Sequence, residues 1–78
     1  MEQIATFHTH LGALRLKKTL DSAGDASAVI MPVPRRLSAS CGTCVRFEIP
    51  FDRTWANEDL DRVYIREDGE YRLIFENE

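Results

Sequence analysis

Two cysteines separated by two residues are the most chemically suggestive feature of this 78-residue chain. They form the motif Cys41-Gly42-Thr43-Cys44. In a reducing compartment, such a pair is more often redox-active, sulfur-handling or metal-binding than a structural disulfide. The spacing lets one thiolate attack or resolve a bond that the other has made. We therefore take Cys41 and Cys44 as candidate catalytic residues. The alternative for Cys44, which adjoins an alternating strand, is a buried small apolar residue.

Positive charge gathers around the two cysteines, although the chain as a whole has a net charge of −3. Residues 1–47 hold six Lys/Arg against three acids, and residues 48–78 hold four against ten. A positive field would favour the thiolate form of a nearby cysteine, and the alternative is an ordinary solvated surface. The candidate binding residues are those expected near the thiols: Arg35, Arg36, Ser38, Ser40, Gly42, Arg46 and His10.

Two histidines, His8 and His10, raise the question of a metal site. With Cys41 and Cys44 they supply two nitrogens and two sulfurs, the ligand count of tetrahedral zinc. A His-x-His segment that spans a strand end and a helix start need not converge on one ion. We therefore assign no metal and no cofactor, and leave open a role for His10 as an imidazole at a helix N-terminus near a thiolate.

The elements that must position these residues can be predicted from apolar spacing. Residues 4–8 form a strand, and Thr9 caps a helix from His10 to Ala23 that Gly24 ends. Residues 28–31 are a buried strand closed by prolines, and residues 35–42 are a loop. Residues 45–49 and 71–75 are further strands.

Residues 52–68 allow two interpretations. The spacing of Trp55, Leu60 and Val63 fits a helix with Gly69 just past its end, which we prefer. The alternative is a β-hairpin that turns at Asp68 and Gly69.

The preferred order of elements predicts an α+β, ferredoxin-like β-α-β-β-α-β fold. Its four-stranded antiparallel sheet would carry two helices on one face. Connectivity then places the loop between the second and third strands at the end of the sheet where the first helix begins. We therefore expect Cys41 and Cys44 to face residues 8–10.

Size and composition restrict the class of protein. The chain is long enough for one small domain, residues 1–78, and a dimer would add buried surface. It has no apolar stretch of membrane-spanning length and no secretory signal, which predicts a cytoplasmic protein. The acidic balance argues against nucleic acid as the main partner.

The stretch from Pro32 to Gly42, closing with Val45-Arg46-Phe47, resembles the signature of the selenium/sulfur (Se/S) carrier protein-like family of small bacterial proteins. The opening residues 7–10 and 13–14 are also similar. The resemblance implies a small α+β domain in which Cys41 matches the family's cysteine, the carrier of sulfane sulfur or selenium. It also implies donor and acceptor proteins as partners.

Three functions compete at this point. The first is a carrier on Cys41, more an accessory protein than a stand-alone enzyme. The second is a thiol–disulfide redox module that uses Cys41 and Cys44 as attacking and resolving cysteines. The third is a binding or regulatory domain without chemistry.

Overall fold

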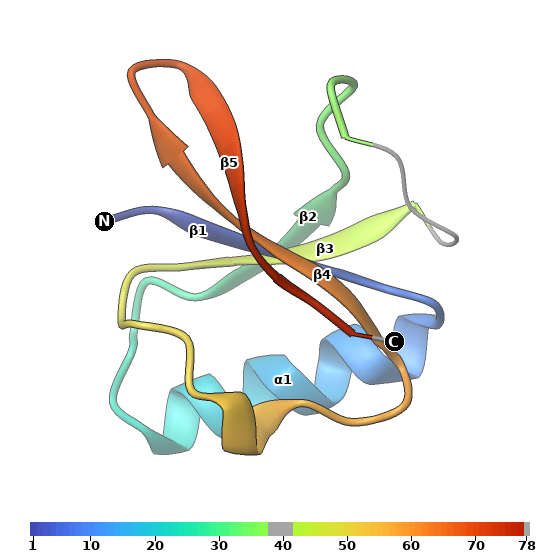
Figure 1. Ribbon diagram of the computed structural model, residues 1–78. Coiled ribbons are helices and arrows are strands. Elements are labelled where there is room, and N and C mark those ends of the chain that lie inside the picture. Colours follow the sequence, from blue (N-terminus) through green and yellow to red (C-terminus); the bar gives the residue numbers. More distant parts are fainter. Residues whose placement is uncertain (38–41, 78) are drawn as a thin grey trace.

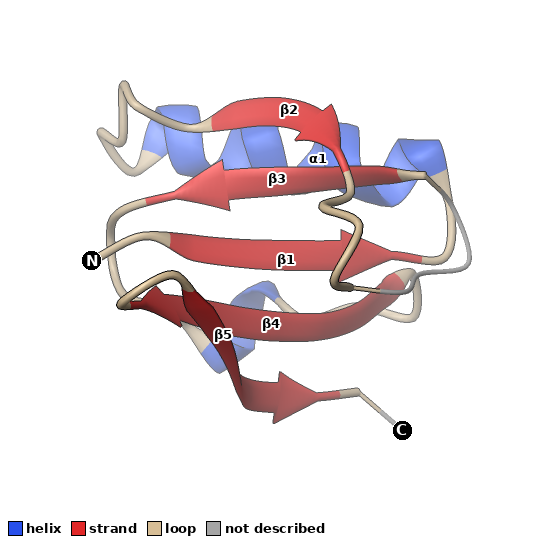
Figure 2. Ribbon diagram, turned by 90° about the horizontal axis from the view of Figure 1, so that it is seen from above, coloured by secondary structure: helices blue, strands red, loops and turns tan. Residues whose placement is uncertain are grey.

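The structure, a computed structural model, describes residues 1–37 and 42–77. A twisted antiparallel sheet of five strands lies over a single α-helix (Figure 1). In chain order the elements are β1 (Gln3–Phe7), α1 (His10–Ser22), β2 (Val29–Pro32), β3 (Thr43–Phe47), the 3-10 turn η1 (Arg53–Trp55), β4 (Leu60–Glu67) and β5 (Glu70–Glu76). The strands lie in the order β2-β3-β1-β4-β5, as the view from above shows (Figure 2).

The predicted helix is confirmed, and local chemistry explains both of its ends. Thr9 is extended, and its Oγ1 accepts a hydrogen bond from the Gly12 N–H at 3.1 Å. Gly24 follows the helix with a φ of +91°, a conformation that glycine adopts without steric cost. The buried face of α1 turns toward the sheet and includes Ala13, Leu16 and Leu20. None of the helices in the described part of the chain is long and apolar enough to cross a membrane.

Strand β1 is the centre of the sheet, and all five of its residues are buried. Ala5 pairs with Val45 on β3 and with Val63 on β4. These three side chains belong to the core that packs against α1. Because side chains alternate along a strand, Ile4 and Thr6 face the opposite side of the sheet.

The predicted second helix is wrong. Residues 60–67 form strand β4, which returns through a tight turn at Asp68 and Gly69 into β5. Both turn residues have positive φ, 50° and 79°, as a two-residue hairpin turn requires. In the described residues the sheet therefore has five strands and packs on one α-helix, whereas four strands and two helices were predicted.

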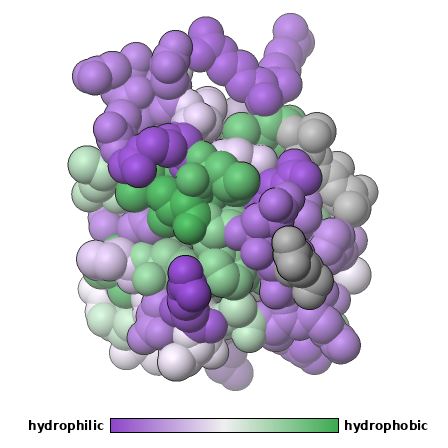
Figure 3. Space-filling view, viewed as in Figure 1, coloured by the Kyte–Doolittle hydropathy of each residue, from purple (hydrophilic) through white to green (hydrophobic). Residues whose placement is uncertain are grey.

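Part of the predicted topology remains. Strands β2 and β3 pair antiparallel, as expected for the two strands that flank the cysteine loop. Strands β1 to β4 are ordered as in a split β-α-β fold, with a crossover of residues 48–59 in place of the second helix. In this crossover Phe51 contacts the rings of Trp55 and Phe75, which pack against the core. Seen from the direction of Figure 1, an apolar surface lies in the middle of the molecule, below a hydrophilic region at the top (Figure 3).

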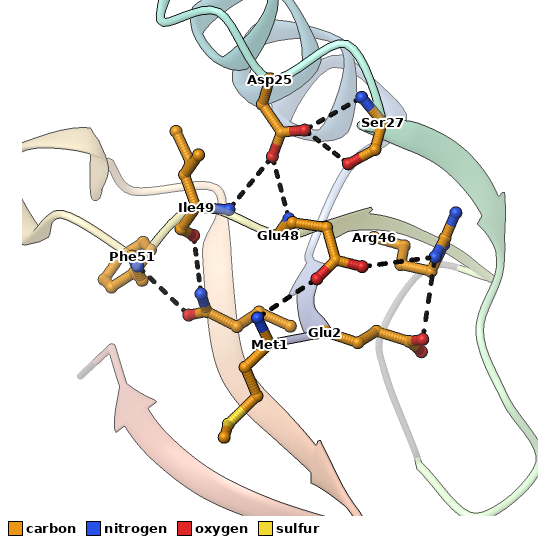
Figure 4. A network of polar contacts seen from close by, with 9 residues as sticks. Met1, Glu2, Asp25, Ser27, Arg46, Glu48, Ile49 and Phe51 are labelled. Carbon is orange, nitrogen blue, oxygen red and sulfur yellow. Dashed lines mark hydrogen bonds and ion pairs between the residues drawn. The ribbon is translucent and has the colours of Figure 1, made fainter.

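A buried carboxylate fixes the start of the crossover. Asp25, which is 5% exposed, accepts hydrogen bonds from the Ser27 N–H and hydroxyl and from the N–H groups of Glu48 and Ile49 (Figure 4). The Ser27 hydroxyl, followed by the backbone donors, lowers the pKa of Asp25 to about 2. The side chain of Gln3 extends this network, donating to the Ile49 carbonyl.

Candidate functional site

The residues that follow Cys41 lie between the end of β2 and the start of α1. The Val33 N–H donates to the Gly42 carbonyl at 3.1 Å. The hydroxyl of Thr43, which is largely buried, lies 2.9 Å from His10 Nδ1 in the first turn of α1. The cysteine motif from Gly42 onward is thus at the end of the sheet expected from connectivity. The candidate residues Ser38, Ser40 and Cys41 lie outside the described residues.

Cys44 is part of strand β3 and is completely buried. It pairs in register with Thr6 on β1 and with Met31 on β2. Its Sγ donates to the Pro32 carbonyl at 3.6 Å. Because its neighbour Val45 belongs to the core beneath the sheet, the Cys44 side chain faces the side away from α1. A thiol in this setting packs like a small apolar side chain and is poorly accessible to reagents.

We expect the Cys44 thiol to react slowly with a soluble alkylating reagent. In a Cys41→Ser variant, alkylation should be roughly 100-fold or more slower in the native protein than in urea, because it requires local opening of β3. Mass spectrometry of quenched time points measures both rates. Equal rates in the native and the unfolded protein would contradict the burial of Cys44.

The three candidate arginines have different surroundings. Arg46, on β3, lies 3.7 Å from Glu2 and 3.9 Å from Glu48. Arg36 is exposed, and its Nη1 donates to the Gly69 carbonyl in the β4–β5 turn at 3.0 Å. Arg35 is exposed beside it. The contacts of Arg46 thus tie it to surface carboxylates, whereas Arg36 joins the loop after β2 to the hairpin.

The two histidines also have different partners. His8 Nε2 lies 3.9 Å from Asp61 Oδ1, whereas His10 contacts Thr43. Within residues 1–37 and 42–77, no group of three or more His, Cys, Asp or Glu side chains is arranged to hold a metal ion. The zinc hypothesis needs Cys41 and therefore extends outside the described residues.

A cavity of about 450 Å³ opens on the sheet face away from α1, and sequence reasoning missed most of it. It is lined by Arg36, Leu37, Arg62, Tyr64, Glu70 and Tyr71. Of these residues, only Arg36 was a binding residue predicted from the sequence. The alternation of Arg62, Tyr64 and Arg66 at every second position was the available signal, because it places three polar side chains on one face of a strand. Interpreting this segment as a helix concealed that face.

Comparisons with known proteins cover most of the chain. Residues 2–63 match a family described as "Putative Se/S carrier protein-like". The chain is also similar to "Uncharacterized protein YtiA" of Escherichia coli (strain K12), with 30% identity over 76 residues, which span 94% of this chain and 88% of the relative. Among solved structures there is no significant match.

Proposed function

Because the chain belongs to the Se/S carrier protein-like family, we propose that it carries sulfane sulfur or selenium on Cys41 between a donor and an acceptor protein. The family match includes the whole segment from Pro32 to Phe47 in which the cysteine motif lies. Family membership supplies the chemical class, and the burial of Cys44 supports the choice of Cys41 over Cys44.

The burial of Cys44 is the observation that carries this choice. A carrier cysteine must meet a sulfur atom held by another protein, and Cys44 is 0% exposed within the sheet. A thiol–disulfide module would need both cysteines to exchange with partners or with each other. The buried position of Cys44 therefore favours a single carrier cysteine, Cys41.

The environment of the motif supports a nucleophilic role for Cys41. Thr43, two residues after Cys41, contacts His10 at the N-terminal end of α1, and the Gly42 carbonyl accepts a hydrogen bond from the Val33 N–H. The free N–H groups of a helix N-terminus favour anions, and a thiolate is the nucleophile that transfer requires.

The transfer step conserves atoms and electrons. The Cys41 thiolate attacks the outer sulfur of a donor persulfide, and a new S–S bond forms as the donor's S–S bond breaks. The donor cysteine leaves as a thiolate, and Cys41 holds the persulfide. An acceptor thiolate then attacks the outer sulfur of the Cys41 persulfide, and Cys41 leaves as a thiolate. Selenium would occupy the outer position in the same way.

Loading can be followed by intact mass. After incubation with a cysteine desulfurase and cysteine, without reductant, the protein should gain about 32 Da that a thiol reductant removes, since a sulfane sulfur bond is labile to thiols. The gain should persist in Cys44→Ser and be absent in Cys41→Ser. Polysulfide, whose transferable sulfur is zero-valent, serves as an additional donor.

The same samples separate the carrier from its alternatives. Loss of loading in Cys44→Ser, combined with ready cycling of the wild-type protein between dithiol and disulfide, would contradict the carrier and favour a redox module. Failure of every donor to load Cys41 would overturn the proposal as well.

A further inference from the structure

The cavity on the sheet face away from α1 has the features of a ligand site, and none of its lining residues belongs to the cysteine motif. We call it the trough and define it by its lining residues, Arg36, Leu37, Arg62, Tyr64, Glu70 and Tyr71. Its sides are the loop after β2 and the β4–β5 hairpin, which both rise from the sheet opposite α1 (Figure 1). Its volume of about 450 Å³ falls within the range of small-molecule sites.

The floor of the trough is strand β4. Val63 points into the core, so Arg62 and Tyr64, one position to each side, point to the opposite face. The two sides of the trough are joined by the hydrogen bond from Arg36 Nη1 to the Gly69 carbonyl. This bond holds the loop against the hairpin and preforms the space between them.

Two guanidinium groups in the trough retain donors for an anion. Each guanidinium has five N–H donors. Arg62 Nε donates to Glu76 Oε2 at 2.9 Å, and Arg36 donates to Gly69. Hydrogen bonds to Tyr64 and Glu76 raise the pKa of Arg62, so this residue remains charged. Paired guanidinium donors match the two oxygens of a carboxylate.

The remaining side chains add a cation site and an apolar side. Glu70 is exposed at the trough, and in the described structure it forms no ion pair within 4.0 Å. Tyr64, Tyr71 and Leu37 provide ring faces and an aliphatic surface between the charged groups. Two cations, one anion and an apolar surface match a small molecule that carries a carboxylate, an ammonium and an apolar group.

We propose that the trough binds a free α-amino acid with an apolar side chain, in its zwitterionic form. The carboxylate pairs with Arg36 and Arg62, and the ammonium pairs with Glu70. The side chain lies against Leu37 and Tyr71. Binding at such an open site is weak, with a Kd of about 1–10 mM expected for a ligand of roughly a dozen heavy atoms.

L-Phenylalanine and two truncated analogues test the proposal directly. In a ¹⁵N-correlation NMR titration of the wild-type protein, L-phenylalanine should shift amide signals of residues 62–72 and leave those of α1 unchanged. Phenethylamine lacks the carboxylate, and 3-phenylpropionate lacks the ammonium. Each should bind roughly tenfold more weakly, the effect of one lost charged interaction of about 1.4 kcal/mol.

Charge-neutralising variants assign the two poles of the ligand. Arg62→Gln should weaken phenylalanine and 3-phenylpropionate alike. Glu70→Gln should weaken phenylalanine and leave 3-phenylpropionate unchanged. Arg72→Gln is the matched control, because Arg72 lies on the same hairpin, pairs with Glu67 and does not line the trough.

A dispersed spectrum with unchanged α1 signals verifies that each variant is folded. Equal affinity for phenylalanine and phenethylamine would overturn the proposal, as would unchanged binding in Arg62→Gln or the absence of shifts at 10 mM ligand. None of these outcomes bears on the loading of Cys41.

Discussion

Replacing Gly12 with valine should lower the free energy of unfolding by about 3 kcal/mol, through overpacking and a poorer helix propensity. Gly12 lies in the first turn of α1, against Phe7 of β1 and Asp59 of the crossover. A Cβ atom there would be 2.6 Å from Asp59 Cβ and 2.9 Å from Phe7 Cδ1. Phe7 is buried, and the Asp59 carbonyl accepts from the His8 N–H at 2.7 Å, so neither neighbour can move freely. Thermal unfolding should show a midpoint lower by at least about 12 °C.

Two alanine variants provide the controls for Gly12. Gly12→Ala should be less damaging than the valine, because alanine restores helix propensity worth about 1 kcal/mol while keeping the clash. Gly42→Ala should stay within about 0.5 kcal/mol of wild type, since no described atom lies within 4 Å of a Cβ at Gly42. A Gly12→Ala protein more stable than wild type would show that α1 can move away from Phe7.

Replacing Asp25 with asparagine should lower the free energy of unfolding by about 3 kcal/mol. Each carboxylate oxygen of Asp25 accepts two hydrogen bonds, one pair from Ser27 and the other from the N–H groups of Glu48 and Ile49. An asparagine amide would place an NH₂ group against one of these pairs of donors, so two buried bonds would be lost. Urea unfolding monitored through Trp55 fluorescence measures the change.

The acid dependence of stability provides a second test of Asp25. Its pKa is lowered to about 2 in the folded protein from an ordinary value of 3.8, so folding favours the ionised carboxylate. This contribution, about 2 kcal/mol, is complete above about pH 4 and is lost as the pH falls toward 2. Asp25→Asn should have a correspondingly flatter profile between pH 4 and 2. Asp21→Asn, the same change at an exposed carboxylate on α1, is the matched control.

Most of the fold follows from local sequence patterns. Thr9 and Gly24 mark the ends of α1 because capping and a positive φ depend on a few adjacent residues. The prediction of a helix over residues 52–68 failed because it, too, depended on local patterns alone. Apolar residues there satisfy a helical period and a strand period equally well, and only pairing with β1 decides between them.

The sequence predicted the position of the candidate site in the fold, but not the side-chain contacts within it. Connectivity brought Thr43 and His10 together correctly, because the directions of successive strands and of the helix between them determine which end of a sheet a loop occupies. The ion pairs of Arg46 did not follow from the sequence, since Glu2 and Glu48 lie just outside the ends of β1 and β3, and Glu2 meets Arg46 only once these strands pair. Most of the trough is lined by residues of the β4–β5 hairpin, so a prediction that made residues 52–68 a helix could not reveal it.

The central position of β1 has a consequence for how the chain acquires its structure. Its residues 3–7 are synthesised well before their pairing partners, because β3 and β4 begin about 40 and 55 residues later in the chain. Strand β1 therefore has no pairing partner until β3 has been synthesised, and its second partner follows with β4. Contacts this distant in sequence slow folding, because a long loop must close before any of them forms. Pairing on both sides of β1 is thus completed only after β4 has been synthesised.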